Sequence, residues 1–117
     1  MAAEPLTPAV FHILVALADG ERHGYGIMQE VAARTGRQTI MGPGTLYGTL
    51  KRMLEAGLVE ECGERADPEA GDERRRYYRL TGRGRKAATA EAERLEALVR
   101  AARSKRLLKT RTAQEGA

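Results

Sequence analysis

The chain has 117 residues, a length that fits one domain, and it contains one Phe, four Tyr and no Trp. Its core must therefore be built mainly from aliphatic side chains. The single cysteine, Cys62, cannot form an intramolecular disulfide, and no apolar run approaches the roughly 20 residues of a membrane span. Residues 1–7 also lack the layout of a signal peptide, so we expect a cytoplasmic protein without a membrane partner.

The formal net charge of +4 is distributed unevenly along the chain. Residues 1–60 carry five Lys and Arg against six Asp and Glu, whereas residues 61–117 carry fifteen against ten. The densest basic run, residues 74–86, contains no acid. Such a run can bind a polyanion or form an ordinary solvated face, and charge alone leaves both interpretations open.

Two N-terminal helices are predicted from capping residues and apolar spacing. The first begins at Thr7-Pro8, which suits a cap followed by a first helical turn, and it ends at Asp19-Gly20. The second begins near His23-Gly24 and ends at Thr35-Gly36, where the glycine suits a left-handed C-cap. Apolar residues recur at helical spacing in both helices: Val10, Ile13, Leu14 and Leu17, then Ile27, Met28 and Val31.

A third helix follows the breaker cluster Gly42-Pro43-Gly44 and is predicted from Thr45, as an N-cap or first-turn residue, to Ala56. Its apolar side consists of Leu46, Leu50, Met53 and Leu54. The opposite side carries Thr45, Gly48, Lys51, Arg52 and Glu55, with Tyr47 and Thr49 on the flanks. Hydroxyls, bases and a small residue are what a DNA recognition helix needs on its outer face, although an ordinary solvated helix can have the same composition.

A two-stranded hairpin is predicted next. Leu58-Val59 begin a short strand towards Cys62, residues 63–73 form a long polar loop, and residues 74–80 form the return strand. Tyr78 and Leu80 share a strand face and are expected in the core. The loop carries five acids against Arg65 alone, so we expect Arg74 and Arg75 at its base, rather than its tip, to contact phosphate.

The last helix is predicted from about Arg83 to about Lys109, followed by a flexible tail over residues 110–117. It carries a heptad-like apolar seam that has no obvious partner within so short a chain. We therefore expect the seam to form the interface of a two-fold homodimer. Its residues are Ala88, Ala92, Leu95, Leu98, Val99 and Ala102.

Three short helices, a hairpin and a long helix are the layout of a winged helix-turn-helix. The predicted fold class is mainly α with a small β-hairpin, in which residues 1–82 form a DNA-binding domain and residues 83–109 a dimerisation helix. At the start of the second helix, His23-Gly24-Tyr25-Gly26 has two interpretations. Its backbone N–H groups could hold a DNA phosphate, or His23 simply caps the helix while Tyr25 packs.

Other patterns do not predict an enzyme or a metal site. Residues 42–48 spell GxGxxxG, but no strand precedes them and no βαβ unit follows. His12, His23 and Cys62 lack metal-ligand spacing, and we expect His12 in the core or an interface and Cys62 as a packed thiol. No acid–base or nucleophile constellation stands out, so neither a catalytic residue nor a cofactor is expected.

Three motifs together resemble those of the PadR-like transcriptional regulators, and the resemblance runs from Leu6 to about Leu108. The first motif is His23-Gly24-Tyr25-Gly26-Ile27. The second is Gly44-Thr45-Leu46-Tyr47-x-x-Leu50-x-Arg52-Met53-x-x-x-Gly57-Leu58-Val59. The third is Arg75-Arg76-Tyr77-Tyr78-Arg79-Leu80-Thr81-x-x-Gly84.

The resemblance implies a homodimer that contacts double-stranded DNA through the helix bearing Thr45 and Tyr47 and through the wing. Many relatives are repressors released by small molecules, and the single helix after the wing is typical of compact relatives. Some compact relatives bind flat drugs between tryptophans, which this chain lacks.

The expected function is therefore a sequence-specific repressor that binds an inverted-repeat promoter operator and responds to an unidentified small-molecule effector. A winged helix used only as a protein–protein adaptor is the alternative, which the acidic wing favours. The expected DNA-binding residues are His23, Gly24, Tyr25, Thr45, Tyr47, Gly48, Thr49, Lys51, Arg52, Arg74 and Arg75.

Overall fold

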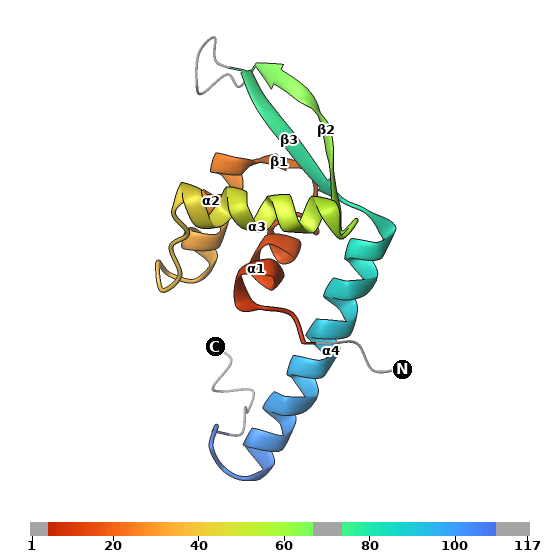
Figure 1. The fold of residues 1–117 in the computed structure, drawn as a ribbon. Helices are drawn as coiled ribbons and strands as arrows, with labels where there is room; N and C mark the ends of the chain where they lie inside the picture. The colour runs from red at the N-terminus through yellow and green to blue at the C-terminus, as the bar shows by residue number, and fades with distance from the viewer. Residues whose placement is uncertain (1–4, 67–73, 110–117) are drawn as a thin grey trace.

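The computed structural model describes residues 5–66 and 74–109, which form a winged helix with a long C-terminal helix (Figure 1). The helices are α1 (Pro8–Ala16), α2 (Gly24–Arg34), α3 (Pro43–Glu55) and α4 (Gly82–Ser104). The strands β1 (Arg22–His23), β2 (Val59–Ala66) and β3 (Arg74–Leu80) form an antiparallel sheet in the order β1-β3-β2. The sheet thus contains one strand, β1, beyond the predicted hairpin. No helix in the described ranges is long and apolar enough to cross a membrane.

Capping side chains and glycines set most helix ends where the sequence predicts them. The Thr7 hydroxyl accepts a hydrogen bond from the Val10 backbone N–H (3.3 Å) and caps α1. Gly36 and Gly57 follow α2 and α3 with φ angles of 58° and 75°, the left-handed conformation that suits a C-cap glycine.

Several boundaries differ from the prediction, and the first is the end of α1, which lies at Ala16 rather than at Asp19-Gly20. Helix α3 begins at Pro43 after the N-cap Gly42, so Thr45 lies in the first turn and is not a cap. Residues 63–66 belong to β2 rather than to the loop, and residues 67–73 lie outside the described residues. Helix α4 ends at Ser104 rather than near residue 109, because Arg106 adopts a left-handed conformation (φ 65°) and completes a C-cap without glycine. The predicted tail, residues 110–117, also lies outside the described residues.

One aliphatic core joins α1, α2, α3 and the base of the sheet. Tyr78 contributes to it from β3 and Leu80 packs against it, as predicted. The buried hydrophobic side chains, each at most 6% exposed, are Ile13, Leu14, Ala16, Leu17, Ile27, Val31, Met41, Leu46, Leu50, Met53, Val59 and Tyr78. Because the apolar side of α3 faces this core, its polar side is directed to the surface.

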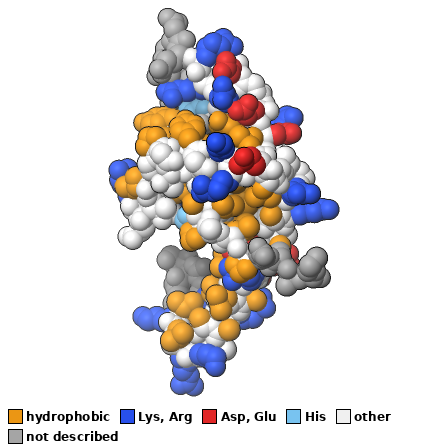
Figure 2. All heavy atoms as spheres, in the orientation of Figure 1, with side chains coloured by type: hydrophobic (Ala, Val, Ile, Leu, Met, Phe, Trp, Pro, Cys, Tyr) orange, Lys and Arg blue, Asp and Glu red, His pale blue; other side chains and the backbone are white. Residues whose placement is uncertain are grey.

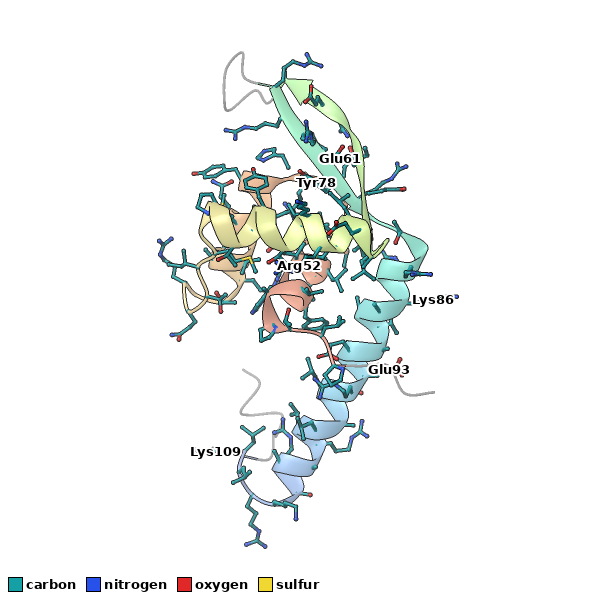
Figure 3. The ribbon with its side chains drawn as sticks, viewed as in Figure 1. Arg52, Glu61, Tyr78, Lys86, Glu93 and Lys109 are labelled. Atoms are coloured by element: carbon teal, nitrogen blue, oxygen red, sulfur yellow. The ribbon has the colours of Figure 1, made fainter. Side chains whose placement is uncertain are left out.

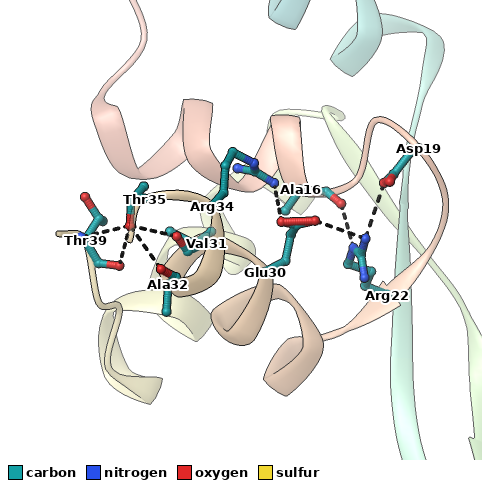
Figure 4. Close-up of polar contacts among 9 residues, drawn as sticks. All are labelled: Ala16, Asp19, Arg22, Glu30, Val31, Ala32, Arg34, Thr35 and Thr39. Atoms are coloured by element: carbon teal, nitrogen blue, oxygen red, sulfur yellow. Dashed lines mark hydrogen bonds and ion pairs between the residues drawn. The ribbon is translucent and has the colours of Figure 1, made fainter. Parts of the chain in front are cut away.

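Polar side chains hold α2 in place between its neighbours (Figure 4). Arg22 donates from Nε to the Ala16 carbonyl at the end of α1 (2.8 Å), and its Nη2 lies 3.3 Å from Glu30 of α2. The Thr35 hydroxyl accepts from the Thr39 backbone N–H (3.0 Å), which ties the segment leading to α3 to the end of α2. These contacts position the two helices of the helix-turn-helix relative to each other.

The start of α4 is attached closely to the turn between α3 and β2. The Thr81 hydroxyl donates to the Gly57 carbonyl (2.6 Å) and accepts from the Gly84 backbone N–H (3.0 Å). A Cβ on Gly84 would lie 1.9 Å from the Leu58 carbonyl oxygen, so only glycine allows this approach. Further along, α4 passes α1 and then extends beyond the other helices (Figure 1).

Candidate nucleic-acid interface

Helix α3 presents a polar face to solvent, opposite its buried apolar side. Thr45, Lys51 and Arg52 are exposed, Tyr47 is 46% exposed and Gly48 is half-buried. Figure 3 shows Arg52 on this helix. The structure therefore brings five of the predicted contact residues to one accessible face. Their hydroxyl and basic groups can donate hydrogen bonds to phosphate oxygens and to base edges.

Thr49 does not belong to this face, which corrects its prediction as a DNA-contacting residue. Its side chain lies on the same side of α3 as Leu46 and Met53, three and four residues away, and it is only 1% exposed. The Thr49 hydroxyl accepts a hydrogen bond from Arg52 Nη2 (3.4 Å). The buried Thr49 hydroxyl therefore orients the Arg52 guanidinium and is not itself accessible to DNA.

The start of α2 lies against the start of α3. A Cβ on Gly24 would lie 2.3 Å from the Tyr47 hydroxyl oxygen, so this glycine allows the tyrosine ring to pack over the α2 backbone. Gly24 is itself buried, and it supports Tyr47 rather than forming a contact surface. His23 caps α2, because its Nδ1 accepts from the Gly26 backbone N–H (2.9 Å). Tyr25 does not pack in the core, since it is 48% exposed.

Arg75 connects this helical surface to the wing. Its guanidinium carbon lies 5.6 Å from the centre of the Tyr25 ring, an arrangement in which a cation is attracted to an aromatic face. Arg74 is exposed at the start of β3 and donates to the Glu64 carbonyl (3.0 Å). The two arginines expected to contact phosphate thus both lie at the base of the hairpin loop, where strand alternation directs their side chains to opposite faces of β3.

Other arginines of the wing are paired with carboxylates of the same hairpin. Arg76 lies 3.3 Å from Glu61, and Arg79 lies 2.8 Å from Glu60. These carboxylates raise the pKa of both guanidinium groups. Their positive charges are therefore offset locally and add little to the field that a polyanion would meet.

Two further arginines of the basic run donate hydrogen bonds to carbonyl groups at the ends of helices. Arg83 donates to the Ala56 carbonyl at the end of α3 (3.4 Å), and Arg85 donates to the Ala18 carbonyl after α1 (3.0 Å). Lys86 points away from α3 (Figure 3). The run over residues 74–86 is thus not one continuous basic patch. Figure 2 shows the same mixture, with Asp and Glu side chains lying among Lys and Arg near the wing and α3.

Apart from the polar face of α3, polar side chains also cluster where β2 passes Glu21, the residue before β1. Cys62 Sγ donates to Glu21 Oε2 (3.2 Å), and Glu21 also pairs with Arg65. Burial and the hydrogen bond to Glu21 raise the pKa of the Cys62 thiol, whereas the hydrogen bond from Arg65 lowers the pKa of Glu21. A raised pKa disfavours the reactive thiolate and agrees with a packed thiol. Within the described residues, His, Cys, Asp and Glu form no group of three or more that could hold a metal ion.

The predicted dimerisation seam on α4 divides into two parts. Ala88 packs against the core, Ala92 lines a hollow together with Phe11 of α1, and Leu95 lines a second hollow of about 330 Å³ with Leu6 and Phe11. The expectation that the seam lacks an intrachain partner is therefore wrong for Ala88 and for the half-buried Leu95, whereas Ala92 is exposed. Beyond them, Ala102 is half-buried, while Leu98 and Val99 are 59% and 43% exposed.

Comparisons with known proteins agree with this architecture. Residues 13–90 match the sequence model of the transcriptional regulator PadR-like family. The chain is 40% identical over 89 residues to the transcriptional regulator Rv3488 of Mycobacterium tuberculosis, which covers 76% of this chain and 77% of that protein.

Solved structures share the fold. A transcriptional regulator from Clostridium thermocellum has a TM-score of 0.68 at 26% identity, covering 82% of this chain and 87% of that chain. Bacillus subtilis PadR in complex with operator DNA has a TM-score of 0.61 at 21% identity, covering 73% of this chain and 46% of that chain. The family match over residues 13–90 and the mycobacterial relative lead to one conclusion: the chain belongs to the PadR-like family of transcriptional regulators.

Proposed function

We propose that the chain is a repressor that binds duplex operator DNA as a homodimer, with α3 in the major groove and the wing along the backbone. The observation that carries this proposal is the exposed face of α3, which presents Lys51, Arg52 and Tyr47 opposite a buried apolar stripe. The fold shared with Bacillus subtilis PadR, which was solved in complex with operator DNA, supports it. Occupying an operator would block transcription, which is why we propose repression.

The roles within the interface follow from position. Lys51 and Arg52 lie in the C-terminal part of α3, on the same polar face as Thr45 in the first turn, and this is the face that a recognition helix turns toward the major groove. Arg74 and Arg75 lie on the wing, where guanidinium groups supply contacts to phosphate that do not depend on sequence.

The homodimer is proposed from the apolar side chains of α4 that the rest of the described chain leaves exposed. Leu98 and Val99 lie next to each other there, and contiguous apolar patches on soluble proteins usually mark an association site. Two-fold symmetry presents two α3 helices to one side of the duplex. The operator is then an inverted repeat with half-sites about 10 bp apart, or a multiple of that.

Fluorescence anisotropy with duplex DNA from upstream of the chain's own gene tests the proposal. Lys51→Ala and Arg52→Ala are each expected to weaken binding by about 1–3 kcal/mol if the residue reads a base. Lys86→Ala is the matched control, because it removes a like charge that points away from α3 (Figure 3). Wild-type affinity in both α3 variants contradicts the proposal.

The phosphate role of the wing has a different signature in the same assay. Arg75→Ala is expected to weaken specific and random duplexes alike and to flatten the salt dependence by about one unit of slope. A loss confined to the specific duplex contradicts this role. A dimer that binds no duplex at any salt concentration favours the adaptor function instead.

A further inference from the structure

The wing changes direction at a bulge in β2. The strand register shifts between Glu61 and Glu64, so Cys62 and Gly63 together face only Tyr77 of β3. Gly63 has a φ of 113°, which glycine adopts without strain. A bulge of this kind increases the local twist and re-aims the strand beyond it. We call the part of the hairpin beyond the bulge, residues 64–66 and 74–76, the outer wing. Its direction therefore depends on the contacts that fix the backbone at the bulge.

Side chains from three segments meet at the bulge. Glu21, just before β1, pairs with Arg65 in the outer part of β2 and accepts from the Cys62 thiol (3.2 Å). The Arg65 guanidinium carbon lies 4.2 Å from the centre of the Tyr77 ring, and the rings of Tyr77 and His23 meet edge to face at 5.3 Å. We call Glu21, Arg65 and Tyr77 the wing clamp.

The wing clamp differs from the other ion pairs of the wing in what it connects. The pairs of Arg76 with Glu61 and of Arg79 with Glu60 lie within the hairpin, so they cannot hold it against the helices. Glu21 belongs instead to the connection between α1 and β1. Glu21 is ionised at neutral pH, since the ordinary pKa of a glutamate already lies well below 7 and the hydrogen bond from Arg65 lowers the pKa of Glu21 further, so the attraction to Arg65 is present.

We propose that Glu21 is a positioning residue that acts through Arg65 and Tyr77 to set the angle of the outer wing against the DNA backbone. This inference rests on the proposed function. It makes an unusual prediction, because an acid beside a polyanion repels it. If Glu21 had no positioning role, its removal would strengthen DNA binding, whereas the wing clamp requires its removal to weaken binding.

Glu21→Gln is therefore expected to weaken operator binding about threefold, the effect of losing one partly exposed ion pair. The matched control is Glu60→Gln, which removes an acid paired with Arg79 within the hairpin and should leave binding unchanged or tighter. In the Glu21→Gln background, Arg75→Ala should change the salt slope less than it does in the wild type. Binding by Glu21→Gln that is as tight as by Glu60→Gln overturns the proposal.

A measurement without DNA separates this proposal from the proposed function. Amide hydrogen exchange in residues 64–66 should rise about threefold in Glu21→Gln, because the outer wing opens more often, and stay unchanged in Glu60→Gln. Exchange in α3 should be the same in all three proteins. Unchanged exchange in residues 64–66 of Glu21→Gln overturns the wing clamp whether or not the protein binds DNA. A wild-type chain that binds no duplex overturns the proposed function, and hydrogen exchange then decides the wing clamp alone.

Discussion

The helical core and the C-terminal part of α4 carry similar aliphatic side chains, yet they bury them very differently. Leu14 of α1 and Leu46 of α3 are 0% exposed. By contrast, Leu98 of α4 is 59% exposed, and Leu107, which follows the end of α4, is 76% exposed. In the core, helices and sheet supply apolar surface from several directions, while α4 extends past them (Figure 1). Apolar spacing thus predicts that a helix face needs a cover, but not whether the same chain or a second copy supplies it.

The attached end of α4 should tolerate the least change. Gly84→Ala places a Cβ 1.9 Å from the Leu58 carbonyl oxygen, and the backbones can separate only by breaking the contacts of Thr81. We expect the free energy of unfolding in urea to fall by about 3 kcal/mol. Gly82→Ala is the control, because its Cβ meets nothing within 4 Å. Similar stability of the two variants would show that this end of α4 is not closely attached.

Substitutions in the C-terminal part of α4 should change the oligomeric state of the protein rather than its fold. Leu98→Glu introduces a charge into the proposed dimer interface and leaves the core intact, so we expect a folded monomer without tight operator binding. Light scattering at micromolar concentration measures the mass, and circular dichroism checks the helix content. Leu98 is preferable to Leu95, because Leu95 lines the hollow beside α1 and a charge there also disturbs the fold.

Ala97→Glu is the matched control for Leu98→Glu. Two residues of an α-helix correspond to a rotation of about 200°, so Ala97 lies on the side of α4 opposite Leu95. The variant adds the same charge on that side, and the dimer should persist. A wild-type chain that is monomeric at micromolar concentration and still binds its operator tightly contradicts the dimer.

The smallest effect is expected at Glu91, where the two parts of α4 meet. Its carboxylate is 5% exposed and accepts from Arg94 Nε (2.9 Å), Arg94 Nη2 (2.7 Å) and the Leu6 backbone N–H. These hydrogen bonds, chiefly those from Arg94, lower the pKa of Glu91 below its ordinary value of 4.5. A lowered folded-state pKa stabilises the fold above the unfolded-state value, and this stabilisation is lost as the pH falls through the folded-state value.

Glu91→Gln should therefore reduce the free energy of unfolding slightly at neutral pH and hardly at all at a pH below the folded-state pKa of Glu91. Urea unfolding at both pH values measures the difference. Glu96→Gln removes an exposed carboxylate that lies 3.4 Å from Arg100 and serves as the control. A loss of stability that stays constant with pH would rule out the ionised carboxylate as its cause.

Sequence predicts the elements whose signals are local. Gly36 and Gly57 identify the ends of α2 and α3, because a left-handed residue after a helix is usually glycine. The end of α4 escapes prediction, because Arg106 adopts that conformation without being glycine. Strand β1 escapes too, since two residues are too few for alternation to be recognised and its partner, β3, lies far along the chain.

The same distinction applies to the candidate interface. Periodicity alone identifies the polar face of α3, including Lys51 and Arg52. It leaves Thr49 on a flank, because its burial depends on how the rest of the fold covers that flank. The pairing of Glu21 with Arg65 joins residues 44 positions apart, so no local pattern indicates it.

The sequence by itself determines the features that depend on local backbone preferences and on apolar periodicity. These are the four helices, the return strand and the polar side of α3. Only the tertiary structure decides which arginines are paired with carboxylates and which part of α4 stays uncovered, because ion pairing and burial involve segments that are distant in the chain. Arg75 and Arg76 are neighbours in sequence and identical in chemistry. Strand alternation sends them to opposite faces of β3, where one lies over Tyr25 and the other pairs with Glu61.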